Sequence, residues 1–186
     1  MRALVKFTDI VDRINEWVGK VFGFLIIATM VVVVYDVCAR YFFNRPTMWG
    51  METSTLLLCG TVFLGGGYCL LHGGHVKVDI IYARWSPRAK AVVDLITYLL
   101  LLSICVVLLW YGGETAWDSL IHHKVSTSAW APPLWPGQIV IPIGGILIGL
   151  QGLAKWIRDW VTAVTGEKKL ESKIVRGEGG IFAKED

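Results

Sequence analysis

The sequence predicts an all-α integral membrane protein with four transmembrane helices, an N-terminal amphipathic helix and both termini in the cytoplasm. Hydrophobic residues make up 54% of the 186 residues and the mean hydropathy is +0.55, which is more apolar surface than a small soluble domain can bury. The apolar residues gather in four long blocks instead of alternating with polar ones. Lysine and arginine lie mainly before the first block, between the second and third blocks, and after the fourth block. These segments all fall on one side of the membrane, which sets the expected orientation.

The first segment of the chain has the pattern of an amphipathic helix. Its apolar residues recur at steps of three and four, and charged residues fill most positions between them. Two placements stay open: the segment lies in the membrane interface, or it continues the first span as one long helix. The apolar positions are Leu4, Phe7, Val11, Ile14 and Val18.

The four apolar blocks are long enough to cross a hydrocarbon core of about 30 Å at about 1.5 Å per residue. No signal-peptidase site follows the first block, so it is expected to be a retained span. Residues 1–164 are expected to form one membrane domain, and the polar residues 165–186 a flexible cytoplasmic tail. The spans are expected at about 21–43, 51–71, 91–111 and 139–157.

The distribution of basic residues predicts the orientation. Fifteen of the 18 lysines and arginines lie in the N-terminal segment, between the second and third spans, or at the C-terminal end. The other three are Arg40, Arg45 and Lys124. Because basic residues concentrate on the cytoplasmic side, both termini are expected there. The nine tryptophans lie near the ends of spans or in loops, as in an aromatic belt.

No cofactor or metal is expected. The four cysteines are scattered through apolar blocks without a CxxC pair, which is typical of small packing residues. His72 and His75 follow the second span, whereas His122 and His123 lie in the loop on the other side. The two pairs are therefore about 30 Å apart, too far to share a haem or a metal ion.

The chain has no pattern typical of an enzyme, and no catalytic or substrate-binding residue is expected. Asp36 can pair with Arg40 four residues later, and Glu52 and Asp94 lie in first helical turns, where the helix dipole favours a carboxylate. A transport path needs convergent ionisable groups near the midplane, and none of the blocks has them. No basic patch suggests nucleic acid. These features predict a non-enzymatic subunit of a larger transporter.

Small residues and prolines mark further structural features. Gly145-x-x-x-Gly149 puts two glycines on one face of the fourth span, and residues 65–67 are three consecutive glycines in the second. Such residues permit close helix approach, either within the chain or at a subunit interface, and both interpretations stay open. The proline-rich stretch 130–137 is expected to make a rigid turn into the fourth span, and Pro142 to kink that span.

Several segments together resemble the small membrane subunit of tripartite ATP-independent periplasmic (TRAP) transporters, the DctQ-type family. The resemblance extends over roughly residues 15–160, and its specificity lies in the order of the motifs along four spans. In chain order the motifs are Arg40-Tyr-Phe-Phe-Asn-Arg-Pro46, Trp49-x-x-Glu52, Gly65-Gly-Gly-Tyr68, His75-Val-Lys-Val-Asp79 and Pro133-Leu-Trp-Pro136 followed by Pro142-Ile-Gly144.

The resemblance implies a three-part transporter in the bacterial inner membrane. A periplasmic receptor captures a small organic anion, a large multi-span subunit carries it in symport with sodium, and the small subunit is a static scaffold for the large one. On this resemblance Arg40, Trp49, Glu52, His75 and Asp79 are positioning groups at helix ends. Together with Gly145 and Gly149, these five residues are the candidates for positioning or for a subunit interface.

Two other functions stay open at this point. One is a membrane anchor subunit of another multi-subunit complex, which visible haem absorbance would support. The other is a small stand-alone exporter, which proton-driven efflux by the purified chain would support.

Overall fold

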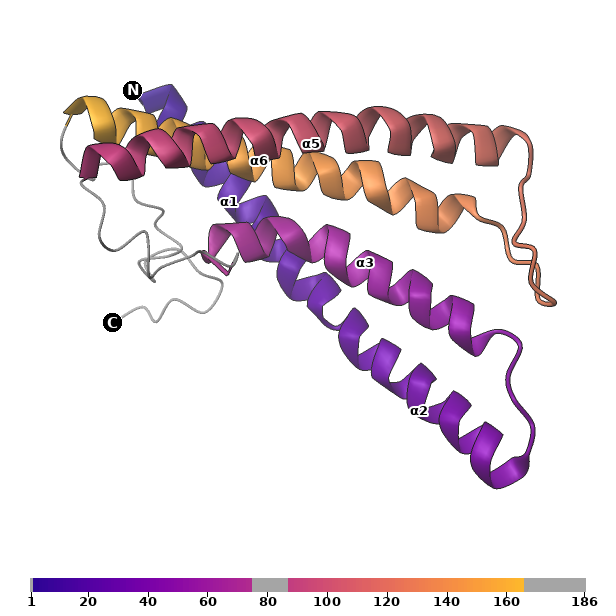
Figure 1. The fold of residues 1–186 in the computed structure, drawn as a ribbon. Coiled ribbons are helices and arrows are strands. Elements are labelled where there is room, and N and C mark those ends of the chain that lie inside the picture. Colours follow the sequence, from indigo (N-terminus) through magenta and orange to yellow (C-terminus); the bar gives the residue numbers. More distant parts are fainter. Residues whose placement is uncertain (1, 75–86, 166–186) are drawn as a thin grey trace.

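The computed structural model describes residues 2–74 and 87–165, so the expected tail at 165–186 lies outside them except for Thr165, the last residue of the last helix. The described residues form helices joined by loops, and their β pairing is limited to one isolated bridge between Val125 and Pro133. The helices, shown in Figure 1, are α1 (Arg2–Gly23), α2 (Leu25–Phe43), α3 (Gly50–Leu71), α5 (Pro87–Ile121) and α6 (Trp135–Thr165).

The predicted four spans are confirmed. Four stretches of the described helices are long and apolar enough to cross a membrane. The stretches are Lys6–Phe43, Gly50–Leu71, Ile96–Ile121 and Trp135–Arg158.

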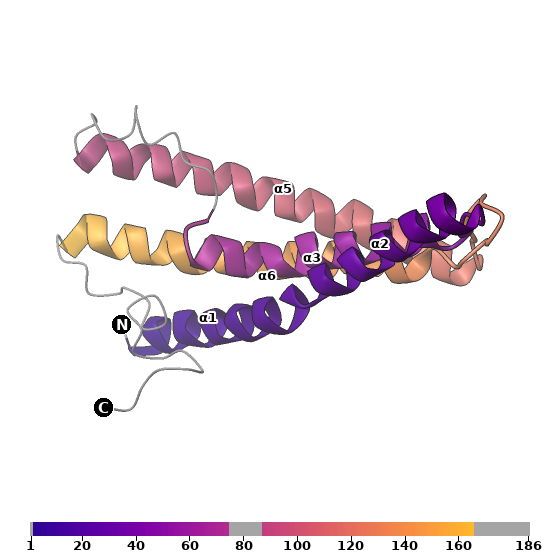
Figure 2. The same ribbon diagram turned by 90° about the horizontal axis from the view of Figure 1, so that it is seen from below.

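The spans form a layer and not a closed bundle. α3 packs between α2 and α6, and α6 packs between α3 and α5, so the order across the layer is α2, α3, α6, α5 (Figure 1). Seen at 90° in Figure 2, the four helices lie at nearly one level at the end where α2 stops. At the other end α1 crosses α3 and α6 on the face opposite α5. The layer therefore presents two broad faces.

The N-terminal segment continues the first span as a nearly unbroken helix. Phe24, the single residue between α1 and α2, itself has helical backbone angles (φ −67°, ψ −17°). The stretch Lys6–Phe43 has 38 residues, about 57 Å at about 1.5 Å per residue, so it is longer than a membrane core of about 30 Å. The continuous helix agrees with the second expected placement, in which α1 extends the first span. Ile10 and Trp17 of α1 face outward, as an interfacial helix also requires.

The sides of α1 are reversed relative to a helix in a soluble protein. Thr8, Asp12 and Asn15 are each 1% exposed, whereas Ile10 is 58% and Trp17 57% exposed. The stripe of Thr8, Asp12 and Asn15 thus packs against the other helices together with Val11, which is 3% exposed, whereas Ile10 and Trp17 face the surroundings. Such an arrangement suits lipid, where the polar groups find partners only inside the protein.

Two helix boundaries differ from expectation. α5 continues to Ile121 instead of ending near residue 111, since Ala116 and Ser119 beyond its two glycines are still buried. α6 begins at Trp135, so the end of the proline-rich stretch is helical rather than a turn. Pro136 lies in the first turn, where a missing N–H removes no helical hydrogen bond. Pro142 lies inside α6, as predicted.

The orientation in the membrane stays a prediction that fusion proteins can test. The start of α1, the end of α3, the start of α5 and the end of α6 lie at one end of the layer (Figure 1), the end that carries most of the basic residues. Alkaline phosphatase fused after Pro46 or Lys124 should be active, and fusions after Arg84 or Asp186 should be inactive, because the enzyme folds only in the periplasm. The reverse pattern of activities would invert every assignment of sides.

Candidate functional site

Arg40 belongs to a polar corner that joins α2 to α3. Its guanidinium donates to Asp36 Oδ2 at 2.7 Å, which confirms the pair expected from the four-residue spacing. Asp36 Oδ1 accepts hydrogen bonds from the backbone N–H of Thr47, at 3.2 Å, and from its hydroxyl. Arg40 thus positions the carboxylate that holds the α2–α3 loop, while its own side chain remains 57% exposed.

Trp49 lies at the start of α3 and packs on the same corner. Its ring stacks on that of Tyr35 from α2, with centroids 5.8 Å apart and planes inclined by 23°. An offset stack of this kind is worth about 0.5–1.5 kcal/mol beyond simple burial. Trp49 therefore helps to fix the angle between α2 and α3 at the membrane boundary.

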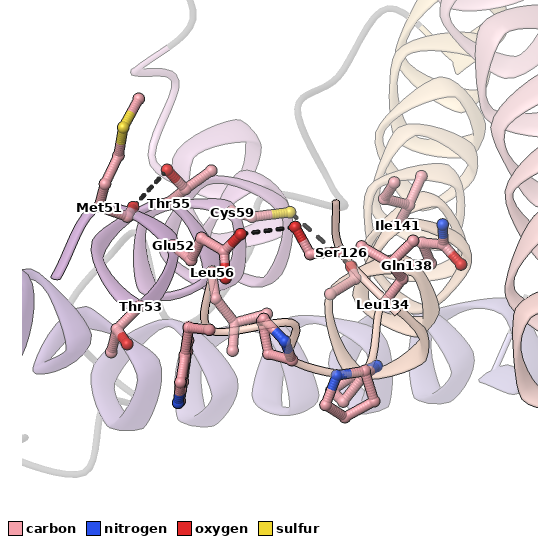
Figure 3. A pocket seen from close by; sticks show the side chains of 15 residues that line it. Met51, Glu52, Thr53, Thr55, Leu56, Cys59, Ser126, Leu134, Gln138 and Ile141 are labelled. Atoms are coloured by element: carbon pink, nitrogen blue, oxygen red, sulfur yellow. Dashed lines mark hydrogen bonds between the residues drawn. The ribbon is translucent and has the colours of Figure 1, made fainter. Parts of the chain in front are cut away.

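Glu52 connects α3 to the loop between α5 and α6. Its Oε1 accepts a hydrogen bond from the Ser126 hydroxyl at 2.5 Å, across 74 residues of sequence. Its Oε2 is shielded from solvent and accepts no hydrogen bond from the described residues. Figure 3 shows the two side chains facing each other beside a pocket of about 670 Å³. The pocket lies between the starts of α3 and α6 and the loop that precedes α6.

Two predicted positioning residues, His75 and Asp79, lie outside the described residues. The neighbouring His72 is described, and its Nε2 lies 2.8 Å from Glu16 Oε2 on α1. Glu16 also pairs with Lys20 one turn later, at 2.7 Å. The end of α3 is thereby tied to α1.

The glycines of α6 contact helices of this chain. A Cβ at Gly145 would lie 3.5 Å from Leu108 of α5, and one at Gly149 would lie 3.4 Å from Cys105 of α5. Both are ordinary contact distances. Gly144 is tighter, because a Cβ there would lie 2.7 Å from the backbone oxygen of Phe63 on α3. Among the glycines of α6, the closest approach to another helix therefore involves Gly144, not the predicted pair, and it takes place within the chain.

Alanine substitutions should separate these glycines. Gly144→Ala is expected to destabilise the fold by about 1–3 kcal/mol, since α3 must move away from α6. Gly65→Ala is the matched control: nothing lies within 4 Å of its missing Cβ, and alanine favours the helix by up to about 1 kcal/mol. Chemical unfolding in detergent measures both. Equal stability of the two variants would contradict the close α3–α6 approach.

A buried polar cluster that was not predicted from the sequence links α1 to α6. Asp12 is at its centre: Gln151 Nε2 donates to Asp12 Oδ1 at 2.9 Å, and Arg158 donates to Asp12 Oδ2 at 2.6 Å. Asn15 donates to Gln151 Oε1 at 2.9 Å. Thr8 lies one turn before Asp12 and is equally buried. We call Thr8, Asp12, Asn15, Gln151 and Arg158 the α1–α6 polar cluster.

A signal for this cluster is nevertheless present in the sequence. Thr8, Asp12 and Asn15 repeat at steps of four and three, so they form a polar stripe along one side of the helix. Gln151 and Arg158 are seven residues apart, two turns on one side of a helix segment in which Lys155 is the other charged residue. Two polar stripes on membrane helices are expected to meet, because lipid offers neither a partner.

The chemistry of these groups is structural. Among the described residues, no group of three or more His, Cys, Asp or Glu side chains is placed to hold a metal ion. Asp12, Glu16, Asp36 and Glu52 each form contacts that hold helices or loops of this chain. The fold and these contacts define a membrane protein whose charged groups hold its own helices and loops together.

The comparisons with known proteins identify the family. The model of the DctQ component of tripartite ATP-independent periplasmic transporters matches residues 29–162, and the chain belongs to this family. It is 21% identical over 160 residues to the ectoine TRAP transporter small permease protein TeaB of Halomonas elongata, covering 82% of this chain and 81% of that protein. It is 22% identical over 152 residues to the C4-dicarboxylate TRAP transporter small permease protein DctQ of Vibrio cholerae, covering 80% of this chain and 60% of that protein.

Membership confirms the coarse functional prediction. Small permease subunits of TRAP transporters are inner-membrane transport subunits and not enzymes. The family implies association with a large membrane subunit and a periplasmic binding protein.

Proposed function

We propose that this chain is a static scaffold for the large transport subunit in sodium-coupled, receptor-dependent uptake of a small organic anion. Residues 1–164 act as one membrane domain in this role. The observation that carries the proposal is the layered arrangement of its spans, whose polar side chains bond helices of the same chain and leave two broad apolar faces.

The central parts of the four spans contain no charged residue that could bind a charged solute. No charged residue occurs in residues 25–35, 53–71, 96–113 or 139–154, which make up the central parts of α2, α3, α5 and α6. The charged contacts of α1, α2 and α3 lie near the two ends of the layer, at Asp12, Glu16, Asp36 and Glu52. A hydrated path for an anion needs polar lining at membrane depth. The transport path therefore belongs to the large subunit.

The faces of the layer suit contact with lipid and with another membrane protein. In α2 the single buried residue is Thr29, and Met30, Val31 and Val34 are each at least 60% exposed. A large apolar surface of this kind is satisfied by lipid or by helices of a partner. The charged contacts at Asp36 and at Asp12 and Glu16 fix the helices relative to one another at the two ends of the layer. A static scaffold beside a moving carrier needs such fixed contacts.

Sodium coupling and the organic-anion substrate rest on the resemblance to the family. The relative from Vibrio cholerae is named for C4-dicarboxylates, which fits that substrate class, and the relative from Halomonas elongata is named for ectoine. The receptor and the large subunit select the substrate in this proposal, and the small subunit does not.

Co-purification tests the assignment of partners. An affinity-tagged form of this chain, co-expressed with the large TRAP subunit of the same transporter, should retain that subunit through purification in mild detergent. An unrelated multi-span membrane protein expressed at the same level is the control. Recovery of this chain alone, with the large subunit present in the membrane, would contradict the scaffold proposal.

A further inference from the structure

We propose that the pocket beside Glu52 receives a lysine or arginine side chain of the large membrane subunit, an inference that rests on the proposed function. The pocket provides one carboxylate in otherwise apolar surroundings. A long basic side chain matches both features, because its carbon stem is apolar and its end is cationic.

The carboxylate of Glu52 is short of partners. Ser126 donates to Oε1 at 2.5 Å, but Oε2 is shielded from solvent and has no hydrogen-bond partner among the described residues. Gln138 Oε1, in the lining of the same pocket, is also shielded from solvent and has no hydrogen-bond partner among the described residues. Buried acceptors without donors are costly, and a buried carboxylate is the most costly of them. An ammonium or guanidinium group brings several donors and a compensating charge.

The basic residues at this end of the chain do not fill the role. Arg40 bonds to Asp36 and Lys124 pairs with Asp118. Arg45 lies exposed in the loop between α2 and α3 and does not line the pocket. Because the described part of the chain places none of these cations in the pocket, the complementary charge is expected to come from a partner.

The depth of the pocket favours a membrane partner over the soluble receptor. Its lining extends from Trp130 and Pro133 in the loop to Cys59 on α3 and Ile141 on α6. Cys59 lies nine residues after the start of α3, so the pocket reaches more than two turns into a membrane-spanning helix. A group carried by a neighbouring membrane helix can reach this depth directly.

Photo-crosslinking in the complete complex tests this occupant. Leu56 lines the pocket and is 42% exposed, while Leu58 on the same helix is 48% exposed and is not part of the lining. p-Benzoylphenylalanine at position 56 should crosslink to a peptide of the large subunit that contains lysine or arginine. The same probe at position 58 should not label that peptide.

Removal of the charge supplies the second part of the test. Glu52→Gln is expected to raise the dissociation rate of the large subunit by about tenfold or more, since truncating one partner of a buried charge pair acts mainly on dissociation. Ser126→Ala keeps the charge and is expected to have a smaller effect. The unfolding of the isolated chain should change little with Glu52→Gln, because that variant loses one intrachain hydrogen bond at most.

The outcomes distinguish this inference from the proposed function. If the complex forms but position 56 labels only phospholipid or the receptor, the inference is wrong and the scaffold function stands. If the complex with Glu52→Gln dissociates at the wild-type rate, the inference is likewise wrong and the scaffold function stands. If no complex with the large subunit forms at all, the proposed function fails and this inference fails with it.

Discussion

Replacing Asp12 by alanine is expected to destabilise the folded chain by about 3–5 kcal/mol, which is the usual cost of removing one partner from a buried ion pair. Asp12 is 1% exposed, and its carboxylate accepts from both Gln151 and Arg158 of α6. Without it the Arg158 side chain, which is only 12% exposed, keeps its charge and loses this partner. α1 should then detach from α6, and unfolding in detergent should begin at lower denaturant concentration.

Two further variants separate charge burial from packing. Asp9→Ala changes an acidic residue on the same helix that is less buried than Asp12, and it should alter stability by less than about 0.5 kcal/mol. The double variant Asp12→Leu with Arg158→Met should recover much of the loss, because apolar groups of similar size replace a buried pair at little cost. Asp12→Ala as stable as Asp9→Ala would show that the α1–α6 polar cluster does not hold the fold.

The four spans could be predicted because a membrane imposes a simple requirement on the sequence. Each span needs about 20 apolar residues, and such blocks are visible without any knowledge of packing. The first and last residues of the helices were predicted less accurately than the number of spans. α5 extends to Ile121 since Ala116 and Ser119 pack inside the protein, while Trp117 and Asp118 between them are exposed on the other side of the helix. A sequence window that averages the two sides of a helix loses this information.

The inner side of α1 could not be chosen from its pattern alone. An amphipathic helix has one apolar and one polar side, and the surroundings decide which of them faces the protein. Here Asp12 and Asn15 face inward because their hydrogen-bond partners, Gln151 and Arg158, lie on α6, about 140 residues later in the chain. Contacts of such separation depend on which helices become neighbours.

The candidate residues show the same division between local and distant contacts. The Asp36–Arg40 pair follows from a spacing of one helical turn, and the sequence is sufficient for it. The partner of Glu52 is Ser126, in a loop after a different span, and no local rule connects them. The glycine motif identified α6 as a close-packing helix. Which helix each glycine meets depends on the arrangement of α3 and α5, so Gly144 was not distinguished from Gly145.

Deletion of this chain is expected to reduce uptake to the background level, even when the receptor and the large subunit are present. A carrier that moves its substrate across the bilayer needs a part that does not move, and in the proposed function the layer of packed helices supplies it. Expression of the intact chain from a plasmid should restore uptake. The large subunit must be shown to reach the membrane in the deletion strain, so that loss of uptake is not loss of the carrier.

Substitutions inside the layer should change the amount of transport and not its selectivity. The central parts of the spans carry no charged residue, and the cluster at Asp12 and the pair at Asp36 and Arg40 hold helices of this chain. Asp12→Ala and Gly144→Ala should therefore lower assembly or rate in proportion to their effect on stability. The relative uptake of competing organic acids should stay the same.

Reconstitution into proteoliposomes tests the scaffold role most directly. Vesicles that contain the large subunit, with receptor and substrate outside and an inward sodium gradient, are compared with and without this chain. We predict sodium-dependent uptake only when this chain is present, and the same ranking of substrates with wild-type and Gly144→Ala chains. Full uptake by the large subunit and receptor alone, or a substitution in this chain that changes the substrate ranking, would contradict the account.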